Sequence, residues 1–390
     1  MSAPFPDSEY AKRLIRVTQS MADKNLDCLV VGDPSNINWL CGYDAWSFYT
    51  PQIMLVTMNR GLIWMGREMD AGAARFTSCL KQSQLVPFPE EYVQRDDIHP
   101  SHYFGDWMVS NGYQGSVIGY ESDTYYFSPK SLASLQEKLP NAKWVDADRL
   151  VNWVRVVKSP AEINMIKQAA EIAAIAMQTA YDGVQPGIRQ CDLMADIAAA
   201  QIRGTPAFGG DMPALHPLVL AGEAASTAHP MWTDAPFEAG QIVAFELGAC
   251  RKRYNAGLAR TVSLGKPVKK LVETAKAVEE GMEAVVNTFK SGVTCESVHA
   301  AWQKVLDRYG LEKKSRIGYS IGVAYAPDWG EHTLSFRPNE KVLVPENAVV
   351  HIILGMWMDN WGMELSETIH IRESDAVCLT QFPREVFEVR

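Results

Sequence analysis

The sequence has no long hydrophobic run and no concentration of positive charge. No apolar segment in the 390 residues approaches the about 20 residues that a membrane-spanning helix needs. Lys and Arg are scattered, and the net charge of −9 argues against nucleic acid or an anionic membrane as the main partner. The first residues also lack the charged-then-apolar layout of a signal peptide. These absences favour a cytoplasmic location and a small molecule as the ligand.

Motifs for metals, disulfides and nucleotides are also missing. The seven cysteines are dispersed and form no C-x-x-C pair, so neither a disulfide framework nor a cysteine zinc site is expected. The histidine motifs H-x-x-x-H and H-E-x-x-H do not occur. Neither a G-x-G-x-x-G loop nor a Walker loop is present. We therefore expect no metal ion and no nucleotide or redox cofactor.

Two domains are expected, because the chain exceeds the size at which a single hydrophobic core stops growing. The first part alternates helix and strand patterns, beginning with an amphipathic helix at 8–23 and a strand at 27–32, which predicts an α/β fold. Ser159, Pro160 and Glu162 then mark the start of a long helix as N-cap, first helical residue and capping-box partner. The predicted domains are 1–158 and 159–390.

The second part repeats one unit of two helices and two strands. Helices expected at 160–182 and 192–203 are joined through Gly187, and helices expected at 269–290 and 296–309 are joined through Gly292. The same offset of 105 residues carries 241–250 onto 346–355 and 254–264 onto 359–369. Because strands match as well as helices, duplication is favoured over chance. The repeat predicts an α+β domain with a pseudo-twofold axis, across which Glu246 corresponds to His351.

One carboxylate lies inside an apolar strand pattern. Glu246 belongs to the run 242–249, in which all of the remaining residues are apolar or glycine. An ionised carboxylate removed from water is costly unless it gains a partner, a proton or a task. The alternative is that Glu246 points to water, and the run is too continuously apolar to show the alternation that would decide between them. We expect Glu246 to belong to a functional site.

The second domain also concentrates side chains suited to acid–base chemistry. Carboxylates and imidazoles supply general acids and bases, and aromatic walls move their pKa values toward neutrality. Glu364 and Glu367 lie three residues apart in a strand pattern, so we expect one to point inward and the other to be solvated. The candidates in addition to Glu246 are His229, Tyr254, Tyr319, Trp329, Glu331, His332, His351, Trp357 and Glu364.

The two-domain layout, the duplicated half and the Lys158–Glu162 helix start resemble the creatinase and aminopeptidase family. The resemblance implies a creatinase-like N-terminal α/β domain and a C-terminal domain of the pita-bread fold. Peptidases of that family hold two metal ions with two aspartates, a histidine and two glutamates. At those positions this chain has Glu246, Gly257, Tyr319, Ile353 and Ser366. The resemblance therefore implies a branch of the family without metal.

Longer segments are similar to the ectoine hydrolase subgroup of this family. They are 36–49, 201–211, 316–322, 327–332 and 353–358. The segment 254–260 departs from the subgroup's usual run, which adds a relative of ectoine to the candidate substrates. The likeness implies hydrolytic opening of the cyclic amidine of ectoine, or of 5-hydroxyectoine, to N-acetyl-2,4-diaminobutyrate. It also implies a homodimer in which Trp46, Phe48 and Tyr49 of an N-terminal loop complete the partner's site.

The resemblance also assigns roles. Glu246 would pair with the amidinium and either activate water or attack the amidine carbon, with Glu364 as a reserve carboxylate. His229 would carry the proton to the departing nitrogen. His351 and His332 would hold the tetrahedral species or the substrate carboxylate. Three alternatives remain: a creatinase-like amidinohydrolase, a metal-dependent Xaa-Pro peptidase and a catalytically silent binding domain.

Overall fold

The computed structural model describes residues 3–390 and divides into two compact units, Met1–Arg155 and Val156–Arg390, called unit 1 and unit 2 below. The division falls close to the predicted boundary at Lys158. Unit 1 contains α1 (Asp7–Asp23), β1 (Cys28–Val31), α2 (Pro34–Cys41), β2 (Ile53–Thr57), β3 (Gly61–Arg67), α3 (Glu68–Thr77), η1 (Gln82–Gln84), β4 (Leu85–Phe88), η2 (Glu90–Tyr92), α4 (Pro100–Ser110), β5 (Val117–Tyr120), α5 (Pro129–Lys138), β6 (Lys143–Asp146) and α6 (Leu150–Arg155).

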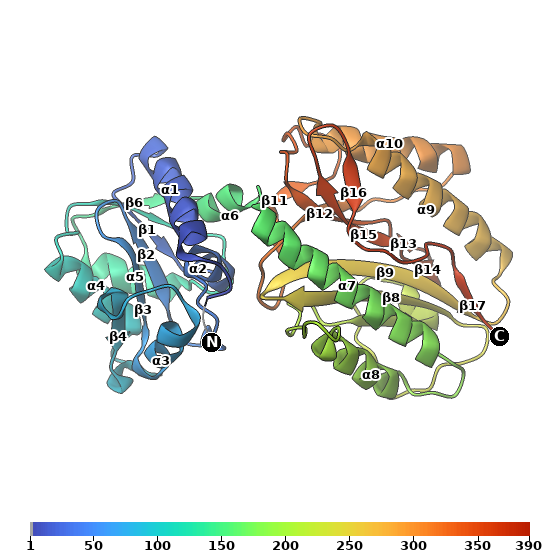
Figure 1. Ribbon diagram of the computed structural model, residues 1–390, viewed down its shortest axis with the longest axis horizontal. Coiled ribbons are helices and arrows are strands. Elements are labelled where there is room, and N and C mark those ends of the chain that lie inside the picture. The colour runs from blue at the N-terminus through green and yellow to red at the C-terminus, as the bar shows by residue number, and fades with distance from the viewer. Residues whose placement is uncertain (1–2) are drawn as a thin grey trace. The chain divides into compact units, whose positions relative to one another are not determined.

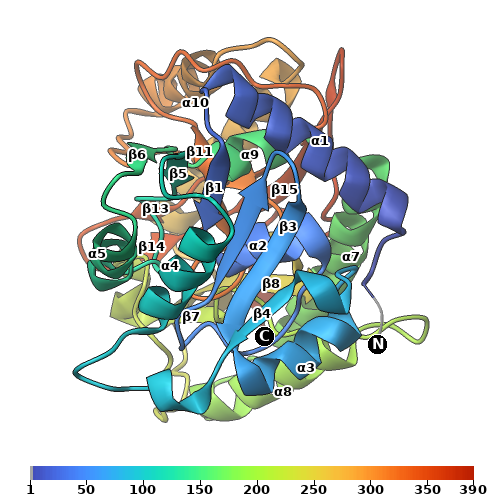
Figure 2. The ribbon, with the colours of Figure 1, turned by 90° about the vertical axis from the view of Figure 1, so that its left-hand side faces the viewer.

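Unit 1 is built on one mixed sheet with the strand order β4-β3-β2-β1-β5-β6. The central strand β1 pairs antiparallel with β2 and parallel with β5. Its four residues are all buried, as expected for a strand covered on both faces. Figures 1 and 2 show α4 and α5 on one side of this sheet and α1 on the other. The predicted α/β fold of the first domain is confirmed.

Unit 2 contains two helix pairs and two larger sheets. Its elements are α7 (Pro160–Gly183), α8 (Gln190–Arg203), β7 (Leu218–Ala221), η3 (Gly222–Ser226), β8 (Ile242–Arg251), β9 (Tyr254–Leu264), α9 (Lys269–Thr288), α10 (Cys295–Tyr309), β10 (Gly318–Ile321), β11 (Gly330–Ser335), β12 (Val349–Ile353), β13 (Met356–Trp357), β14 (Gly362–Met363), β15 (Ser366–Ile371), β16 (Ala376–Cys378) and β17 (Phe387–Val389). One sheet has the order β17-β9-β8-β7 and the other the order β11-β10-β12-β15-β16.

The two halves of unit 2 repeat one another, as the sequence predicts. Gly187 and Gly292, which connect the helices of each pair, both have positive φ, +91° and +85°, which favours glycine. The amide of Gly187 donates to the carbonyl of Phe237 at 2.8 Å, and that of Gly292 donates to the carbonyl of Val344 at 2.9 Å. Equivalent turns thus make equivalent hydrogen bonds. The predicted pita-bread architecture with its αα-ββ duplication is confirmed.

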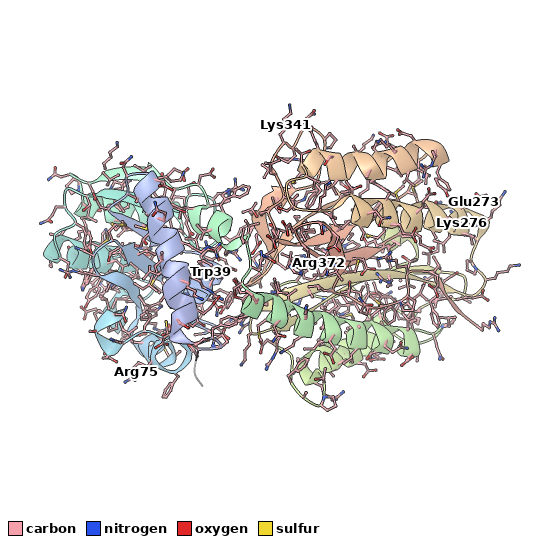
Figure 3. All side chains as sticks on the ribbon, turned by 45° about the horizontal axis from the view of Figure 1, so that its top comes forward. Trp39, Arg75, Glu273, Lys276, Lys341 and Arg372 are labelled. Atoms are coloured by element: carbon pink, nitrogen blue, oxygen red, sulfur yellow. The ribbon has the colours of Figure 1, made fainter. Side chains whose placement is uncertain are left out.

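Helix α7 begins at the predicted capping box. The amide of Ser159 donates to Glu162 Oε2 at 2.9 Å, and the amide of Glu162 donates to Ser159 Oγ at 3.3 Å. In Figure 1, α7 and α8 lie along β8 and β9, whereas α9 and α10 lie over the strands of the second sheet. Glu273 and Lys276 on the outer face of α9 point away from the sheet (Figure 3). The helices therefore cover the outer faces of the two sheets.

Strands β9 and β15 join the two sheets of unit 2. The amide of Ala259 donates to Ser366 Oγ at 2.7 Å, and the amide of Gly257 donates to Thr368 Oγ1 at 2.9 Å. Side-chain hydroxyls thus supply hydrogen bonds where the backbone ladders of the two sheets end. The strands that carry Glu246 and His351, β8 and β12, flank this junction. In residues 3–390, no helix combines the length and apolar character that crossing a membrane requires.

Candidate active site

Glu246 lies in the middle of β8, opposite Leu218 of β7 and Ala259 of β9. Its side chain is buried, with the residue only 5% exposed, so the alternative in which it points to water is wrong. Burial, followed by the negative charge of Glu364, raises the pKa of Glu246 well above its ordinary value. The strand therefore holds a carboxyl group whose charged form is disfavoured by its surroundings.

Glu364 provides the second buried carboxyl group. Its backbone is fixed by Thr261, whose Oγ1 accepts from the Glu364 amide at 2.9 Å. Trp357 Nε1 donates to Glu364 Oε1 at 2.9 Å, whereas Oε2 is buried and has no hydrogen-bond partner in residues 3–390. Burial raises the pKa of Glu364 to about 7, although the Trp357 hydrogen bond and the charge of Lys313 oppose the increase. A pair of like charges in such a space retains a proton near neutral pH.

His351 belongs to a block of aromatic side chains with Tyr319 and Trp329. Its Nε2 is 2.8 Å from Ser366 Oγ, and its Nδ1 is 3.4 Å from the hydroxyl of Tyr319. Trp329 Nε1 donates to that same hydroxyl at 2.7 Å. Burial lowers the pKa of His351 to about 3, so the imidazole is neutral at physiological pH. Burial and then the charge of Glu246 raise the pKa of Tyr319, which stays protonated. The block offers neutral hydrogen-bonding groups beside two carboxyls.

The imidazole of His351 fills the space in front of Gly257. A Cβ atom added to Gly257 would lie 2.9 Å from His351 Nε2, closer than carbon and nitrogen atoms pack. The position therefore has room for glycine alone unless His351 moves. The expectation from the pseudo-twofold that Glu246 and His351 face one cavity stays a prediction. Both lie near Tyr319, whose hydroxyl is 3.4 Å from His351 Nδ1 and whose pKa is raised by burial and then by the charge of Glu246.

Three of the predicted substrate contacts have partners within unit 2. The Glu331 carboxylate pairs with Lys158 Nζ at 2.5 Å, and both side chains are 1% exposed. The hydroxyl of Tyr254 donates to Glu162 Oε1 at 3.0 Å. His332 Nε2 lies 2.9 Å from Asp328 Oδ2. These contacts hold β9, β11 and the start of α7 in place, and binding of substrate by Tyr254, Glu331 and His332 stays a prediction.

The remaining predicted residues lie on exposed segments. His229 is exposed in the loop between η3 and β8, and its imidazole has no hydrogen-bond or ion-pair partner in residues 3–390. In unit 1, Trp46 and Tyr49 are 57% and 64% exposed, and Phe48 packs against Trp46 with ring centroids 4.7 Å apart. Roles for these four residues in the site stay predictions.

The expectation that one of Glu364 and Glu367 is solvated is wrong, and Lys313 was not among the residues predicted from the sequence. Glu367 is buried, not solvated, because Arg260 and Arg384 both donate to its Oε1 at 2.9 Å. Lys313 is buried against Trp357 and Gly355, although it stands in the polar run 312–315. No pattern in that run distinguishes Lys313 from its exposed neighbour Lys314. Ser366, which bonds both His351 and Ala259, was noted only as a replaced ligand.

Comparisons with known proteins agree with this architecture. Residues 164–373 match the model of metallopeptidase family M24, and residues 13–157 match the creatinase/prolidase N-terminal domain. An ectoine hydrolase from Halomonas elongata is 38% identical, covering 99% of both chains. The chain belongs to metallopeptidase family M24. Its predicted membership of the creatinase and aminopeptidase family is thus confirmed, as is the broader prediction of a hydrolase acting on carbon–nitrogen bonds.

Solved M24 structures share the fold across the whole chain. The prolidase of Thermococcus sibiricus superposes with a TM-score of 0.84 at 18% identity, covering 97% of this chain and 99% of that one. Dipeptidase PepE of Mycobacterium ulcerans gives a TM-score of 0.82 at 19% identity, covering 99% of both chains. At these identities the likeness concerns the fold alone.

The donor set of this M24 chain does not fit a metal centre. Of the five positions that bear metal ligands in the family's peptidases, only Glu246 still offers a carboxylate. Gly257 and Ile353 have no donor side chain, and Ser366 and Tyr319 are hydrogen-bonded to His351. Within residues 3–390, no group of three or more His, Cys, Asp or Glu side chains is placed to hold a metal ion.

Proposed function

We propose that this protein is a metal-independent hydrolase that opens the ring of a cyclic amidine of the ectoine class. The observation that supports this most is the buried pair Glu246 and Glu364, with one oxygen of Glu364 lacking a partner. The substrate class comes from the 38% identical relative, which is named an ectoine hydrolase. 5-Hydroxyectoine, which contains the same amidine, is a second candidate substrate.

The pair suits the charge and shape of an amidinium. This group is a planar cation with two N–H donors, and carboxylates bind such forks with short, charge-assisted hydrogen bonds. In the free protein, burial raises the pKa values of both carboxyls, and the charge of Glu364 adds to the increase at Glu246. A bound cation lowers both pKa values, because it stabilises the charged forms. Binding of the amidinium therefore favours the carboxylate anions that recognise it.

The reaction then needs one nucleophile and one proton carrier. Glu246 activates a water molecule that attacks the amidine carbon, or attacks that carbon itself to form a covalent intermediate that a water molecule then hydrolyses, which frees the carboxylate again. In either route a C–O bond forms at that carbon. The tetrahedral species collapses, one ring C–N bond breaks, and the departing nitrogen takes a proton. The ring opens to N-acetyl-2,4-diaminobutyrate, with one water consumed for each ring. Tyr319 and neutral His351 are the hydrogen-bonding groups that we assign to the tetrahedral oxygen.

Assignment of the proton carrier rests on the family resemblance. We propose His229 for this role, since it is the histidine that matches the proton-transferring residue of creatinase. Its exposed loop precedes β8, and η3 at the start of that loop packs on β14, next to Glu364. Loss of the wild-type pH–rate profile in His229→Ala supports the role, whereas an unchanged profile excludes it.

Metal independence is part of the proposal and is tested by chelation. If the enzyme needs no metal ion, as its side-chain donors indicate, exhaustive dialysis against a chelator leaves turnover unchanged. Loss of activity that manganese restores would instead identify a metal-dependent peptidase-like enzyme. X-Pro dipeptides and creatine serve as the matching comparison substrates.

We also propose a homodimer in which Trp46, Phe48 and Tyr49 complete the partner subunit's site. The aromatic faces suit an amidinium through cation–π attraction. Support comes from the resemblance and from the exposure of Trp46 and Tyr49. Mixing a Trp46→Ala protein with a Glu246→Gln protein restores activity only if sites are built across subunits.

The experiment that tests the function is turnover of ectoine, followed by the appearance of the N-acetyl product. The wild-type protein opens ectoine faster than it hydrolyses an X-Pro dipeptide. Glu246→Gln folds normally and loses on the order of 10³-fold or more in turnover, the scale expected for a nucleophile or base. A normally folded Glu246→Gln protein with full turnover would contradict the assignment of Glu246 as the nucleophile or base.

A further inference from the structure

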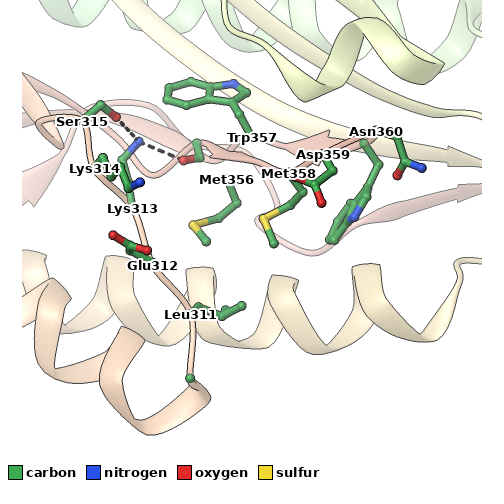
Figure 4. Close-up of a pocket in the computed structure, with 13 residues that line it drawn as sticks. Leu311, Glu312, Lys313, Lys314, Ser315, Met356, Trp357, Met358, Asp359 and Asn360 are labelled. Atoms are coloured by element: carbon green, nitrogen blue, oxygen red, sulfur yellow. Dashed lines mark hydrogen bonds between the residues drawn. The ribbon is translucent and has the colours of Figure 1, made fainter.

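Lys313 is buried in a stretch of the chain that is otherwise solvated. It lies between α10 and β10, 9% exposed, whereas Glu312 and Lys314 on either side are exposed. Its ammonium group donates to the carbonyl of Gly355 and to Ser315 Oγ, both at 2.8 Å, and lies 4.1 Å from the centroid of the Trp357 ring. Figure 4 shows these contacts at the edge of a groove of about 710 Å³ lined by residues 310–315 and 355–361.

These contacts fix the position of Trp357. Gly355 directly precedes β13, which ends at Trp357, and Lys313 holds this short segment by the carbonyl of Gly355 and by the face of the indole. The same indole donates its only N–H to Glu364 Oε1 at 2.9 Å. An ammonium against an aromatic face is worth more when it is desolvated, as Lys313 is here. Lys313 thus acts on the carboxyl of Glu364 through Trp357.

The result is an asymmetric carboxyl group. Glu364 Oε1 is occupied by the indole, and Glu364 Oε2 is buried without a partner in residues 3–390. A buried polar atom left without a hydrogen bond is costly, and such atoms in native proteins call for an explanation. The explanation here is that Oε2 is kept for a ligand N–H, with its direction set by the bond at Oε1.

The charges around Lys313 agree with this arrangement. Burial lowers the pKa of Lys313 to about 8, and the charge of Glu364 opposes that decrease. His299 of α10 also faces the ammonium, and its pKa is lowered by burial and then by Lys313. Glu364 in turn is faced by Glu246 from β8. Lys313 is therefore a cation whose charge offsets part of the cost of burying the carboxyl of Glu364.

We propose that Lys313 is a positioning residue that, by clamping Gly355 and Trp357, holds Glu364 with one oxygen occupied and the other directed at the substrate. The inference rests on the proposed function for the role of Glu364. Its structural part, the clamp itself, is independent of that function. The two parts can therefore be tested separately.

The structural part is tested by the indole N–H resonance of Trp357 in the full-length protein, assigned as the signal missing from Trp357→Phe. Lys313→Met shifts this resonance, because the segment and the indole are released. Lys314→Met, which removes the exposed neighbouring charge, leaves it unchanged. An unshifted Trp357 signal in a folded Lys313→Met protein overturns the clamp, whatever the substrate proves to be.

The functional part is tested by steady-state kinetics with ectoine on the same variants. Lys313→Met lowers kcat by about 10- to 100-fold, the cost of a misplaced catalytic group, with a smaller change in KM. Lys313→Arg restores part of kcat, since it keeps the cation and the donors, and Lys314→Met behaves as wild type. Combining Lys313→Met with Trp357→Phe costs no more than the worse single change, because both act through one contact.

Each outcome decides one of the two parts. Additive losses in the double variant, or normal kcat in Lys313→Met with a shifted Trp357 signal, overturn the positioning role. A wild-type protein that fails to open ectoine removes the proposed substrate but leaves the resonance test of the clamp valid.

Discussion

Glu364 and Glu367 lie three residues apart, and both are 1% exposed, yet their surroundings are opposite. Glu367 accepts hydrogen bonds from Arg260, Arg384 and Thr380, so its charge is neutralised within the fold. Glu364 accepts one hydrogen bond from an indole and leaves its other oxygen without a partner in residues 3–390. Burial alone therefore does not mark a functional carboxylate. A better indication of function is a buried carboxylate with an oxygen that lacks a hydrogen-bond partner.

Removing the charge of Glu367 tests the contrast between the two glutamates and has the largest expected effect on stability. In Glu367→Gln, Arg260 stays fully buried without its counter-ion, which costs about 3–5 kcal/mol in free energy of unfolding. Urea denaturation measures the loss, with Glu385→Gln on the exposed surface nearby as the control. A loss under about 1 kcal/mol would mean that the ion pair does not carry the structural role given to it here.

Glu364→Gln gives the opposite result. Turnover of ectoine falls by about 100-fold, because the amide cannot pair with the amidinium as a charge. Stability in urea changes by less than about 1 kcal/mol, since a neutral side chain replaces one that was costly to ionise. Equal losses of stability in the two glutamine variants would contradict the assignment of a structural role to Glu367 and a functional role to Glu364.

Crowding His351 tests the block beside Glu246 without touching either glutamate. Gly257→Ala places a methyl group 2.9 Å from His351 Nε2, and overpacking of this kind costs about 1–3 kcal/mol. The control is Gly115→Ala, where no atom lies within 4 Å of the added Cβ. Thermal unfolding of both variants measures the difference. A Gly257→Ala protein as stable as the control would show that the imidazole moves freely.

The last expected effect concerns the pH dependence of stability. The pKa of Glu364 is about 7 in the fold and 4.5 when unperturbed, so between these values the folded state binds more protons than the unfolded state. Stability contributed by this group is present below the lower value and is lost as pH rises to the upper one, by at most about 1.4 kcal/mol per pH unit.

The matching measurement is urea unfolding of wild type and Glu364→Gln across this pH range. The wild-type protein loses more stability than the variant as pH rises from 4.5 to about 7. Parallel curves for the two proteins would show that Glu364 ionises in the fold as it does in water.

The sequence carried enough local information to predict the framework of the molecule. The capping box at Ser159 and Glu162 and the glycines 187 and 292 act through neighbours only a few residues away. For the same reason the α/β alternation and the duplicated half could be predicted from periodicity and offset. The sequence could identify Glu246 as a charge in apolar surroundings, because the residues next to it along the strand are also its neighbours in the fold.

The finer arrangement of the site depends on contacts between distant residues. Glu367 is paired because Arg260 is brought to it from β9, and Lys313 is buried because the segment at Gly355 and Trp357 covers it. Alternation within one strand assigns two glutamates to two faces but does not show which face has arginines. The wrong expectation for Glu367 and the missed role of Lys313 both have this cause.

The imidazole in front of Gly257 has a consequence for how this branch of the family can evolve. An aspartate restored at position 257 would enter with its Cβ 2.9 Å from His351 Nε2, so it requires that His351 be replaced as well. A histidine restored at 319 would remove the hydroxyl that accepts from Trp329. Each substitution alone therefore disturbs a contact of the present fold, and an aspartate at 257 requires a second change at His351.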